Sequence, residues 1–258
     1  MSTLSHAIVL ITGASSGIGK ACAERFAAAG AKLILSARRT TRLQELASEL
    51  KTRYGTETFL LELDVRDAKA VAVAFNKLPD EWHAIDVLVN NAGLSRGLDK
   101  LHEGKLEDWE EMIDTNVKGL LYVSRTVIPG MVKRHRGTVV NIGSIAGREV
   151  YVGGNVYCAS KHAVDAITRG LRMDLVDTPV RVCTVDPGLV QTEFSEVRFR
   201  GDAERAKKVY MGYTPLSPSD VADAVHYCAA APAHVQIAEI LILPTAQAST
   251  TLVHKTAG

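Results

Sequence analysis

The sequence predicts an α/β fold, with one doubly wound, seven-stranded parallel sheet flanked by helices. Three observations support this fold class. Short apolar runs alternate with longer amphipathic segments, each run is almost wholly apolar, and a glycine-rich turn follows the first run. Runs of this kind are typical of parallel strands that helices cover on both faces. We expect a single domain over residues 1–258.

Seven strands are expected along the chain. They are AIVLIT (7–12), KLILSA (32–37), TFLLELDV (58–65), IDVLVNNAG (85–93), GTVVNIGS (137–144), VRVCTVDPG (180–188) and AEILILP (238–244). Helices are expected between them, at 17–29 and 42–53 and, at greater length, at 107–135 and 151–176. Residues 188–216 form the one long irregular zone, which predicts a lid over the site, because long loops in compact domains are usually functional.

Composition excludes some classes of function. The formal net charge of +1 gives no electrostatic reason to expect nucleic acid or an anionic membrane as a partner. The four cysteines form no C-x-x-C pair and no zinc spacing, so we expect reduced thiols and no metal site. The first apolar run is too short for a signal peptide or a membrane span. We therefore expect a cytoplasmic protein.

The turn after the first strand carries three glycines, Gly13, Gly17 and Gly19, with Ser15, Ser16 and Ile18 between them. In this pattern the first glycine allows a tight turn, the second lets a diphosphate approach the backbone, and the third lets the helix pack on the strand. A glycine-rich turn without a ligand is the alternative. The strand–turn–helix context favours dinucleotide binding and is typical of a Rossmann domain.

The end of the second strand, Ser36-Ala37-Arg38-Arg39, indicates which dinucleotide is bound. An NAD site usually has a carboxylate here for the ribose 2′-hydroxyl, whereas arginine pairs well with a phosphate. We therefore expect NADP, although Arg39 could merely begin the next helix. Asp64 and Val65 are expected near the adenine ring, with a helix N-cap as the alternative role of Asp64.

Tyr157 and Lys161 are four residues apart and would share one face of a helix. An ammonium group next to a phenol lowers the phenol pKa, so that the phenol can exchange a proton with an alcohol or ketone oxygen. This spacing also occurs by chance. It gains weight from Ser144, which ends the fifth strand and could hold the reacting oxygen or simply cap a helix.

Two asparagine positions complete the candidate site. Asn116 lies in the middle of a predicted helix, where asparagine is unfavourable. It could interrupt the helix and hold a water beside Lys161, or be an ordinary polar position. Asn91, with Ala92 and Gly93, ends the fourth strand, where it would lie beside the cofactor ribose or form a turn.

These motifs, with Pro187 and Gly188, resemble the short-chain dehydrogenase/reductase family over essentially the whole chain. The resemblance implies an NAD(P)-dependent enzyme, usually a homotetramer. It implies that Ser144, Tyr157 and Lys161 are catalytic with the help of Asn116, and that Tyr157 and Lys161 also contact the cofactor. It further implies that Pro187, Gly188, Val190 and Thr192 contact the nicotinamide side.

Several shorter segments resemble one branch of that family, the NADP-dependent 3-hydroxy acid dehydrogenases. They are LPDEW (78–82), EDWE (107–110), GGNVY (153–157), TEFS (192–195), VRF (197–199) and PAHV (232–235). The resemblance implies serine, 3-hydroxypropionate or 3-hydroxyisobutyrate as substrate, or malonic semialdehyde in the reducing direction. Residues 148–150 and the C-terminal tail depart from the pattern.

A 3-hydroxy acid needs a cation for its carboxylate, and Arg148, Arg198 and Arg200 are the candidates, with surface ion pairs as the alternative. We expect Arg148 and Arg198 to hold the carboxylate. In the oxidation that the resemblance implies, Tyr157 removes the hydroxyl proton while the hydride passes to NADP⁺. A broad NADPH carbonyl reductase of neutral ketones is the alternative enzyme, and an NADPH sensor without turnover is the alternative from another class.

Overall fold

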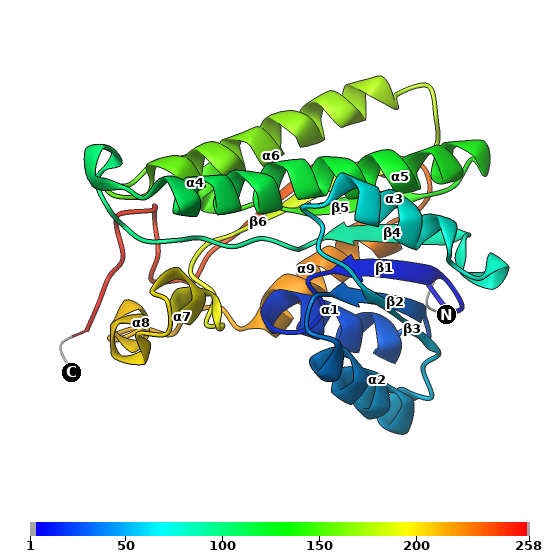
Figure 1. Ribbon diagram of the computed structural model, residues 1–258, viewed down its shortest axis with the longest axis horizontal. Coiled ribbons are helices and arrows are strands. Elements are labelled where there is room, and N and C mark those ends of the chain that lie inside the picture. Colours follow the sequence, from blue (N-terminus) through cyan, green and yellow to red (C-terminus); the bar gives the residue numbers. More distant parts are fainter. Residues whose placement is uncertain (1–3, 257–258) are drawn as a thin grey trace.

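Seven parallel strands form one sheet in the computed structural model, which describes residues 4–256 (Figure 1). Their order across the sheet is β3-β2-β1-β4-β5-β6-β7. The strands are β1 (Ile8–Thr12), β2 (Lys32–Ala37), β3 (Thr58–Glu62), β4 (Ile85–Asn90), β5 (Thr138–Ile142), β6 (Arg181–Pro187) and β7 (Glu239–Ile242). The order reverses between β1 and β4, where doubly wound sheets bind ligands outside the carboxyl ends of the strands. The predicted fold class is confirmed.

Helices cover both faces of the sheet (Figure 1). On one side lie α1 (Gly17–Ala28), α2 (Thr40–Tyr54) and α9 (Pro218–Ala230), and on the other α3 (Ala68–Asn76), α4 (Leu106–Ile113), α5 (Leu120–Lys133) and α6 (Asn155–Asp174). Val9 and Ile11 belong to a buried cluster with residues of α1, whereas Ile8 and Leu10 belong to a second cluster with residues of α5. Since both faces are covered, the strand needs apolar residues at every position. Within residues 4–256, no helix is both long and apolar enough to cross a membrane.

Strands β3 to β7 end one to three residues before their predicted boundaries. β3 ends at Glu62 instead of residue 65, because its neighbour β2 ends at Ala37 and offers no further backbone partner. β4 and β5 end at Asn90 and Ile142, where their mutual pairing stops at Asn90 and Asn141. The residues after these strands therefore turn away from the sheet toward the site.

The two long predicted helices are divided or shortened. The 107–135 prediction corresponds to α4, a π-helical turn at Asp114–Gly119, and α5. The 151–176 prediction corresponds to α6, which begins only at Asn155. Gly153 has a φ of +76°, and a Cβ at Gly154 would lie 2.3 Å from Tyr151 Cε2, so this stretch forms a tight turn.

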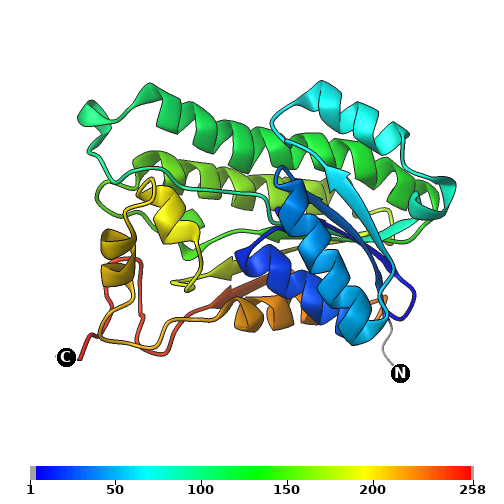
Figure 2. The same cartoon turned by 60° about the horizontal axis from the view of Figure 1, so that its bottom comes forward.

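The 188–216 segment contains two short helices, α7 (Phe194–Arg198) and α8 (Ala203–Val209), and lies beside the C-terminal tail (Figure 2). From the sequence alone, residues 250–258 could form a subunit-crossing arm or a frayed end, and their composition favours neither. In the described part, the Thr256 amide donates to the Gly212 carbonyl at 2.8 Å, and the Thr250 amide donates to Glu149 at 2.8 Å. Through residue 256 the tail is therefore bound to its own chain, and residues 257–258 lie outside the described residues.

Candidate active site

A cavity of about 640 Å³ lies at the carboxyl ends of the strands. Most of the predicted site residues line it. These are Gly13, Ser15, Ser16, Gly17, Ile18, Arg38, Arg39, Asp64, Val65, Asn91, Ala92, Gly93, Ser144, Tyr157, Lys161, Pro187, Gly188, Val190, Thr192 and Arg198. Gly19 and Asn116 contact lining residues from behind, and Arg148 lies outside the wall.

The glycine turn has the geometry that the motif predicts. Gly13 has a φ of +66°, and a Cβ at Gly19 would lie 2.3 Å from the Gly13 carbonyl oxygen. Asn91 braces this turn, since its Nδ2 donates to the Thr12 and Gly13 carbonyl oxygens at 2.9 and 3.2 Å. Ser16 precedes α1 without a side-chain cap. The first amides of the helix are therefore left to meet an anion in the cavity.

The two predicted phosphate-binding arginines have different surroundings. Arg38 is 54% exposed and lies 3.9 Å from Asp64. Arg39 donates to Ser16 Oγ at 2.8 Å and to Glu193, in the 188–216 segment, at 3.2 Å. Both guanidinium groups line the cavity, and Arg38 is the less engaged of the two.

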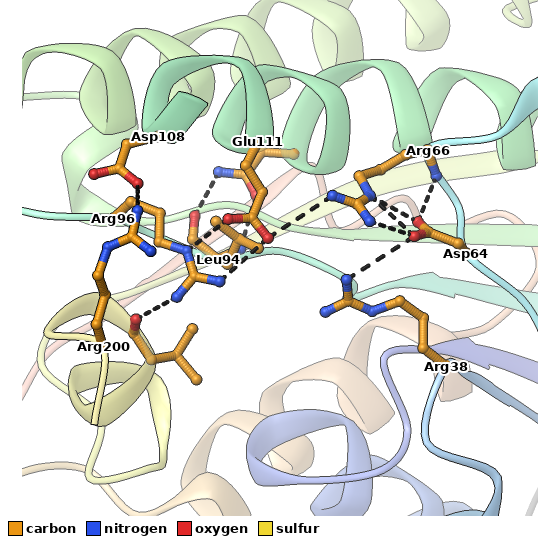
Figure 3. Close-up of polar contacts among 10 residues, drawn as sticks. Arg38, Asp64, Arg66, Leu94, Arg96, Asp108, Glu111 and Arg200 are labelled. Carbon is orange, nitrogen blue, oxygen red and sulfur yellow. Dashed lines mark hydrogen bonds and ion pairs between the residues drawn. The ribbon is translucent and has the colours of Figure 1, made fainter. Parts of the chain in front are cut away.

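Asp64 is not a helix N-cap in the structure. Asp67 has that role, because its side chain accepts from the first amides of α3. Asp64 is instead held by Arg66, whose Nη2 lies 2.6 Å from Oδ2 (Figure 3). These hydrogen bonds from Arg66 hold the pKa of Asp64 below its ordinary value, so the carboxylate stays charged at the cavity wall.

Ser144 and Tyr157 lie together at the end of β5 and the start of α6. Ser144 Oγ accepts from the Ala146 amide at 3.1 Å, so the serine also caps the short turn at Ile145–Gly147. Tyr157 is buried, and burial raises its pKa. The charge of Arg198 and a hydrogen bond with Ser144 oppose that rise. The phenol is thus placed to exchange a proton with an oxygen held beside Ser144.

Lys161 and Asn116 lie on either side of Gly93, since a Cβ there would lie 3.7 Å from Lys161 Nζ and 3.2 Å from Asn116 Oδ1. Lys161 Nζ donates to the Ile142 carbonyl at 2.8 Å, and burial lowers its pKa to about 8, against the charge of Asp186. The sequence assigns the lowering of the Tyr157 pKa to Lys161. In the structure the Arg198 guanidinium carbon lies 5.3 Å from the Tyr157 ring centroid, and its charge also lowers that pKa.

The π-helical turn explains why asparagine occurs in the middle of a helix. Asn116 Oδ1 accepts from the Leu94 amide at 2.8 Å, and its Nδ2 donates to the Leu94 carbonyl at 2.8 Å and to Ser160 Oγ at 3.0 Å. The predicted interruption of the helix is present. The side chain itself joins the loop after β4 to α6, and the water beside Lys161 stays a prediction.

Arg198 is the predicted carboxylate ligand that reaches the cavity. Its guanidinium carbon lies 5.3 Å from the Tyr157 ring centroid and 5.0 Å from that of Phe194, and its Nη2 donates to Tyr151 Oη at 3.0 Å. Its Nε is buried without a hydrogen-bond partner among the described residues. A buried donor of this kind is costly to leave unpaired, which indicates a place for an acceptor from a ligand.

The expectation that Arg148 holds a substrate carboxylate requires correction. Its guanidinium donates to Asp186 at 2.6 Å and to Glu239 at 2.8 Å, and it is absent from the cavity wall. Two carboxylates already neutralise it. Arg200, the other candidate, pairs with the buried Asp108 (Figure 3). Both arginines form ion pairs, as in the alternative interpretation, but with the buried carboxylates Asp186 and Asp108 instead of partners on the surface.

The cavity is also lined by residues that the sequence reasoning did not select. Those with polar side-chain contacts include Arg96, Tyr151, Glu193, Ser195, Tyr210, Gln247 and Thr250. Gln247 Oε1 accepts from the Leu189 amide at 2.8 Å, which ties the C-terminal tail to the 188–216 segment. A position just past the last strand was the available signal for Gln247. The others come together through contacts between distant segments, which leave no local pattern.

Comparison with known proteins agrees with this geometry. The short chain dehydrogenase family matches residues 7–202, which is more than half of the chain. The chain belongs to this family, and the resemblance drawn from the motifs is confirmed.

Individual relatives are similar over nearly the full length. The NADP-dependent 3-hydroxy acid dehydrogenase YdfG of Salmonella typhi is 50% identical over 241 residues, covering 93% of this chain and 96% of that protein. The NADP-dependent 3-hydroxy acid dehydrogenase of Schizosaccharomyces pombe is 44% identical over 256 residues, or 99% of each chain. A solved structure, the closed form of a serine dehydrogenase complexed with NADP⁺, aligns with a TM-score of 0.91 at 47% identity, covering 96% of this chain and 100% of that one.

Proposed function

We propose that the protein is an NADP-dependent oxidoreductase that transfers a hydride between NADP(H) and a 3-hydroxy acid such as serine or 3-hydroxypropionate, or the matching semialdehyde. The observation that carries the substrate class is Arg198, a guanidinium beside Tyr157 with a buried, unpartnered Nε among the described residues. The names of the relatives support the same substrate class.

The residues present fit NADP. The first amides of α1 suit the diphosphate, and Arg38 with Arg39 suits the 2′-phosphate. Ser36 Oγ, at the same end of the cavity, is buried without a partner among the described residues and is available to a ligand. The predicted residues from Gly13 to Thr192 would hold the rest of the cofactor. When bound, NADP accepts or returns the hydride.

The chain's own residues carry out the proton transfer. In oxidation, Tyr157 Oη takes the proton of the substrate hydroxyl while Ser144 Oγ holds the same oxygen. Arg198 favours the phenolate and also attracts the substrate carboxylate. Lys161, with a pKa near 8, can release and recover a proton close to neutral pH, which suits it to pass the proton toward solvent.

We also propose that the 188–216 segment acts as a lid, since Phe194 and Arg198 on α7 line the cavity opposite the strand ends. A homotetramer is proposed because α6 leaves Met173 75% exposed, and Val176 just beyond it is 83% exposed. The four buried, unpaired cysteines support a cytoplasmic location.

The test compares 3-hydroxypropionate with propane-1,3-diol, a neutral alcohol of similar size, by following absorbance at 340 nm with NADP⁺ or NAD⁺. We expect wild type to prefer NADP⁺ and the acid. Arg198→Met should raise KM for the acid by about 10- to 100-fold, the usual effect of losing a charged hydrogen bond, with much less change in KM for the diol. Lys207→Met removes an exposed cation from the same segment and should change neither KM.

Equal use of the acid and the diol by wild type, with no selective effect of Arg198→Met, would favour the broad carbonyl reductase instead. Absence of turnover with every substrate, despite NADP binding, would favour the sensor.

A further inference from the structure

Two arginines line the substrate end of the cavity, and their surroundings differ. Arg198 forms no ion pair with Asp or Glu within the described part of the chain, and one of its nitrogens is unpartnered there. Arg96, in the loop between β4 and α4, is 18% exposed and is bound at both ends of its guanidinium. Arg96 is therefore not a free cation for a substrate, and its position in the wall needs another explanation.

One edge of the Arg96 guanidinium binds Glu111 of α4. Nε donates to Oε2 at 2.6 Å, and Nη2 donates to Oε1 at 3.2 Å, which is a bidentate pair (Figure 3). Arg66 lies 3.8 Å from the same carboxylate and continues to Asp64 and Arg38. The hydrogen bond from Arg96 and these positive charges lower the pKa of Glu111, so the pair stays ionised at neutral pH. A charged, bidentate partner fixes the plane of the guanidinium.

The remaining nitrogen of Arg96 points to the 188–216 segment. Nη1 donates to the Val197 carbonyl at 2.6 Å, and the next amide, of Gly97, donates to the Arg198 carbonyl at 3.0 Å. These carbonyls lie at the end of α7, where the Val197 carbonyl also accepts a longer hydrogen bond from the Arg200 amide, at 3.3 Å. Two adjacent donors of one loop, Arg96 Nη1 and the Gly97 amide, thus hold the two carbonyl groups that flank the Arg198 Cα.

Arg200, two residues further along, is the second attachment. It pairs with Asp108 of α4, and it has a φ of +54°, a left-handed conformation that costs energy for a residue with a side chain. The backbone around Arg198 is therefore fixed by contacts to the 96–97 loop and to α4. The Arg198 side chain, in contrast, keeps a donor available.

We propose that Arg96 is a positioning residue for substrate selection: clamped by Glu111, it holds the Val197 carbonyl and so sets Arg198 at the height at which a substrate carboxylate can bind beside Tyr157. The proposal rests on the proposed function of Arg198. A displacement of about 1 Å is enough to impair a bidentate contact and the placement of a reacting group.

The test uses Arg96→Met, which keeps much of the side-chain volume and removes every donor. We expect KM for 3-hydroxypropionate to rise about 10- to 100-fold, kcat to stay within about twofold, and kcat/KM for propane-1,3-diol to stay within about twofold. Arg96→Lys, which can reach either the carboxylate or the carbonyl but cannot form the bidentate fork, should lie between wild type and Arg96→Met. Arg125→Met, at an exposed position of α5, is the matched control and should behave as wild type.

Two readouts do not depend on turnover. Amide hydrogen exchange over 194–201 should become faster in Arg96→Met while exchange over α5 stays unchanged. The NADP⁺ dissociation constant, measured by fluorescence quenching, should change less than twofold. If Arg96→Met shifts both substrates equally, or leaves exchange over 194–201 unchanged, the positioning role is wrong.

The parallel variant Arg198→Met separates the two proposals. If Arg198→Met selectively impairs the acid and Arg96→Met does not, only the role of Arg96 fails. If Arg198→Met has no selective effect on the acid, the carboxylate anchor fails, and the purpose assigned to Arg96 fails with it. If protein with methionine at position 96 does not fold, Arg96→Lys carries the same KM comparison.

Discussion

The half of the cavity that faces β1 and β2 and the half that faces the 188–216 segment differ in what holds them in place. The first half is fixed largely through backbone atoms: Gly19 packs on the Gly13 carbonyl, and Asn91 Nδ2 donates to the Thr12 and Gly13 carbonyl oxygens. The second half is fixed largely by ion pairs between side chains, such as Arg96 with Glu111 and Arg39 with Glu193.

This difference separates rigid binding from selection. Backbone contacts of the glycine turn tolerate little change, because any Cβ at Gly19 meets the chain itself. Ion pairs of partly exposed side chains contribute less stability and can be rearranged at modest cost. The half that binds the common cofactor is therefore the inflexible one, and the half that we propose to select the substrate is the adjustable one.

Tyr157 lies where the two halves meet, and its replacement should have the largest effect. Tyr157→Phe removes the one hydroxyl assigned to proton transfer, so we expect kcat to fall by about 10²- to 10⁴-fold. The NADP⁺ dissociation constant, measured by fluorescence quenching, should change little because the glycine turn is untouched. Residual turnover above a tenth of the wild-type rate would remove the phenol from the mechanism.

Gly19→Ala tests the rigidity of the cofactor half. The added Cβ would lie 2.3 Å from the Gly13 carbonyl oxygen and 2.5 Å from Asn91 Nδ2, so the turn must move. We expect a loss of about 1 to 3 kcal/mol in the free energy of unfolding, measured by urea denaturation, together with weaker NADP⁺ binding.

Gly170→Ala is the matched control for that substitution. Gly170 lies inside α6, and a Cβ there meets nothing within 4 Å. It should leave NADP⁺ binding unchanged and raise stability slightly, by about 0.5 to 1 kcal/mol, because alanine favours the helix. Equal losses in the two variants would mean that the close approach at Gly19 does not matter.

The sequence was sufficient for the half of the site that is coded by local patterns. Gly13, Arg38, Ser144 and Tyr157 all line the cavity as predicted, because each belongs to a motif at the end of a strand or start of a helix. Parallel strands bring their carboxyl ends to one edge of the sheet, so strand order was not needed to place these residues together.

The substrate half could not be predicted in the same way. Arg148 and Arg198 have the same side chain, and the sequence alone shows no partner for either. Only the structure shows that Asp186 and Glu239 neutralise Arg148. The same holds for the Tyr157 pKa: Lys161 lies one helical turn away in the sequence, whereas nothing in the sequence showed that Arg198 of α7 would lie beside the Tyr157 ring. Partners that arrive through tertiary packing leave no spacing to detect.

The pH dependence of the reaction tests whether Arg198 lowers the Tyr157 pKa, and the expected shift is the smallest of the predicted effects. Arg198 lowers the pKa of Tyr157 because a cation stabilises the phenolate, so Arg198→Met should raise that pKa further. Oxidation requires the phenolate, so kcat/KM for oxidation rises with pH. In Arg198→Met this rise should occur at higher pH than in wild type. Reduction requires the phenol, so the reductive activity of Arg198→Met should persist to higher pH than that of wild type.

Propane-1,3-diol and its aldehyde are both neutral, so using them removes the carboxylate contact from the measurement. Lys207→Met is the control and should leave both pH profiles unchanged. If the pH profile of Arg198→Met does not move, Lys161 is the cation that lowers the Tyr157 pKa, and Arg198 serves only to bind the substrate carboxylate.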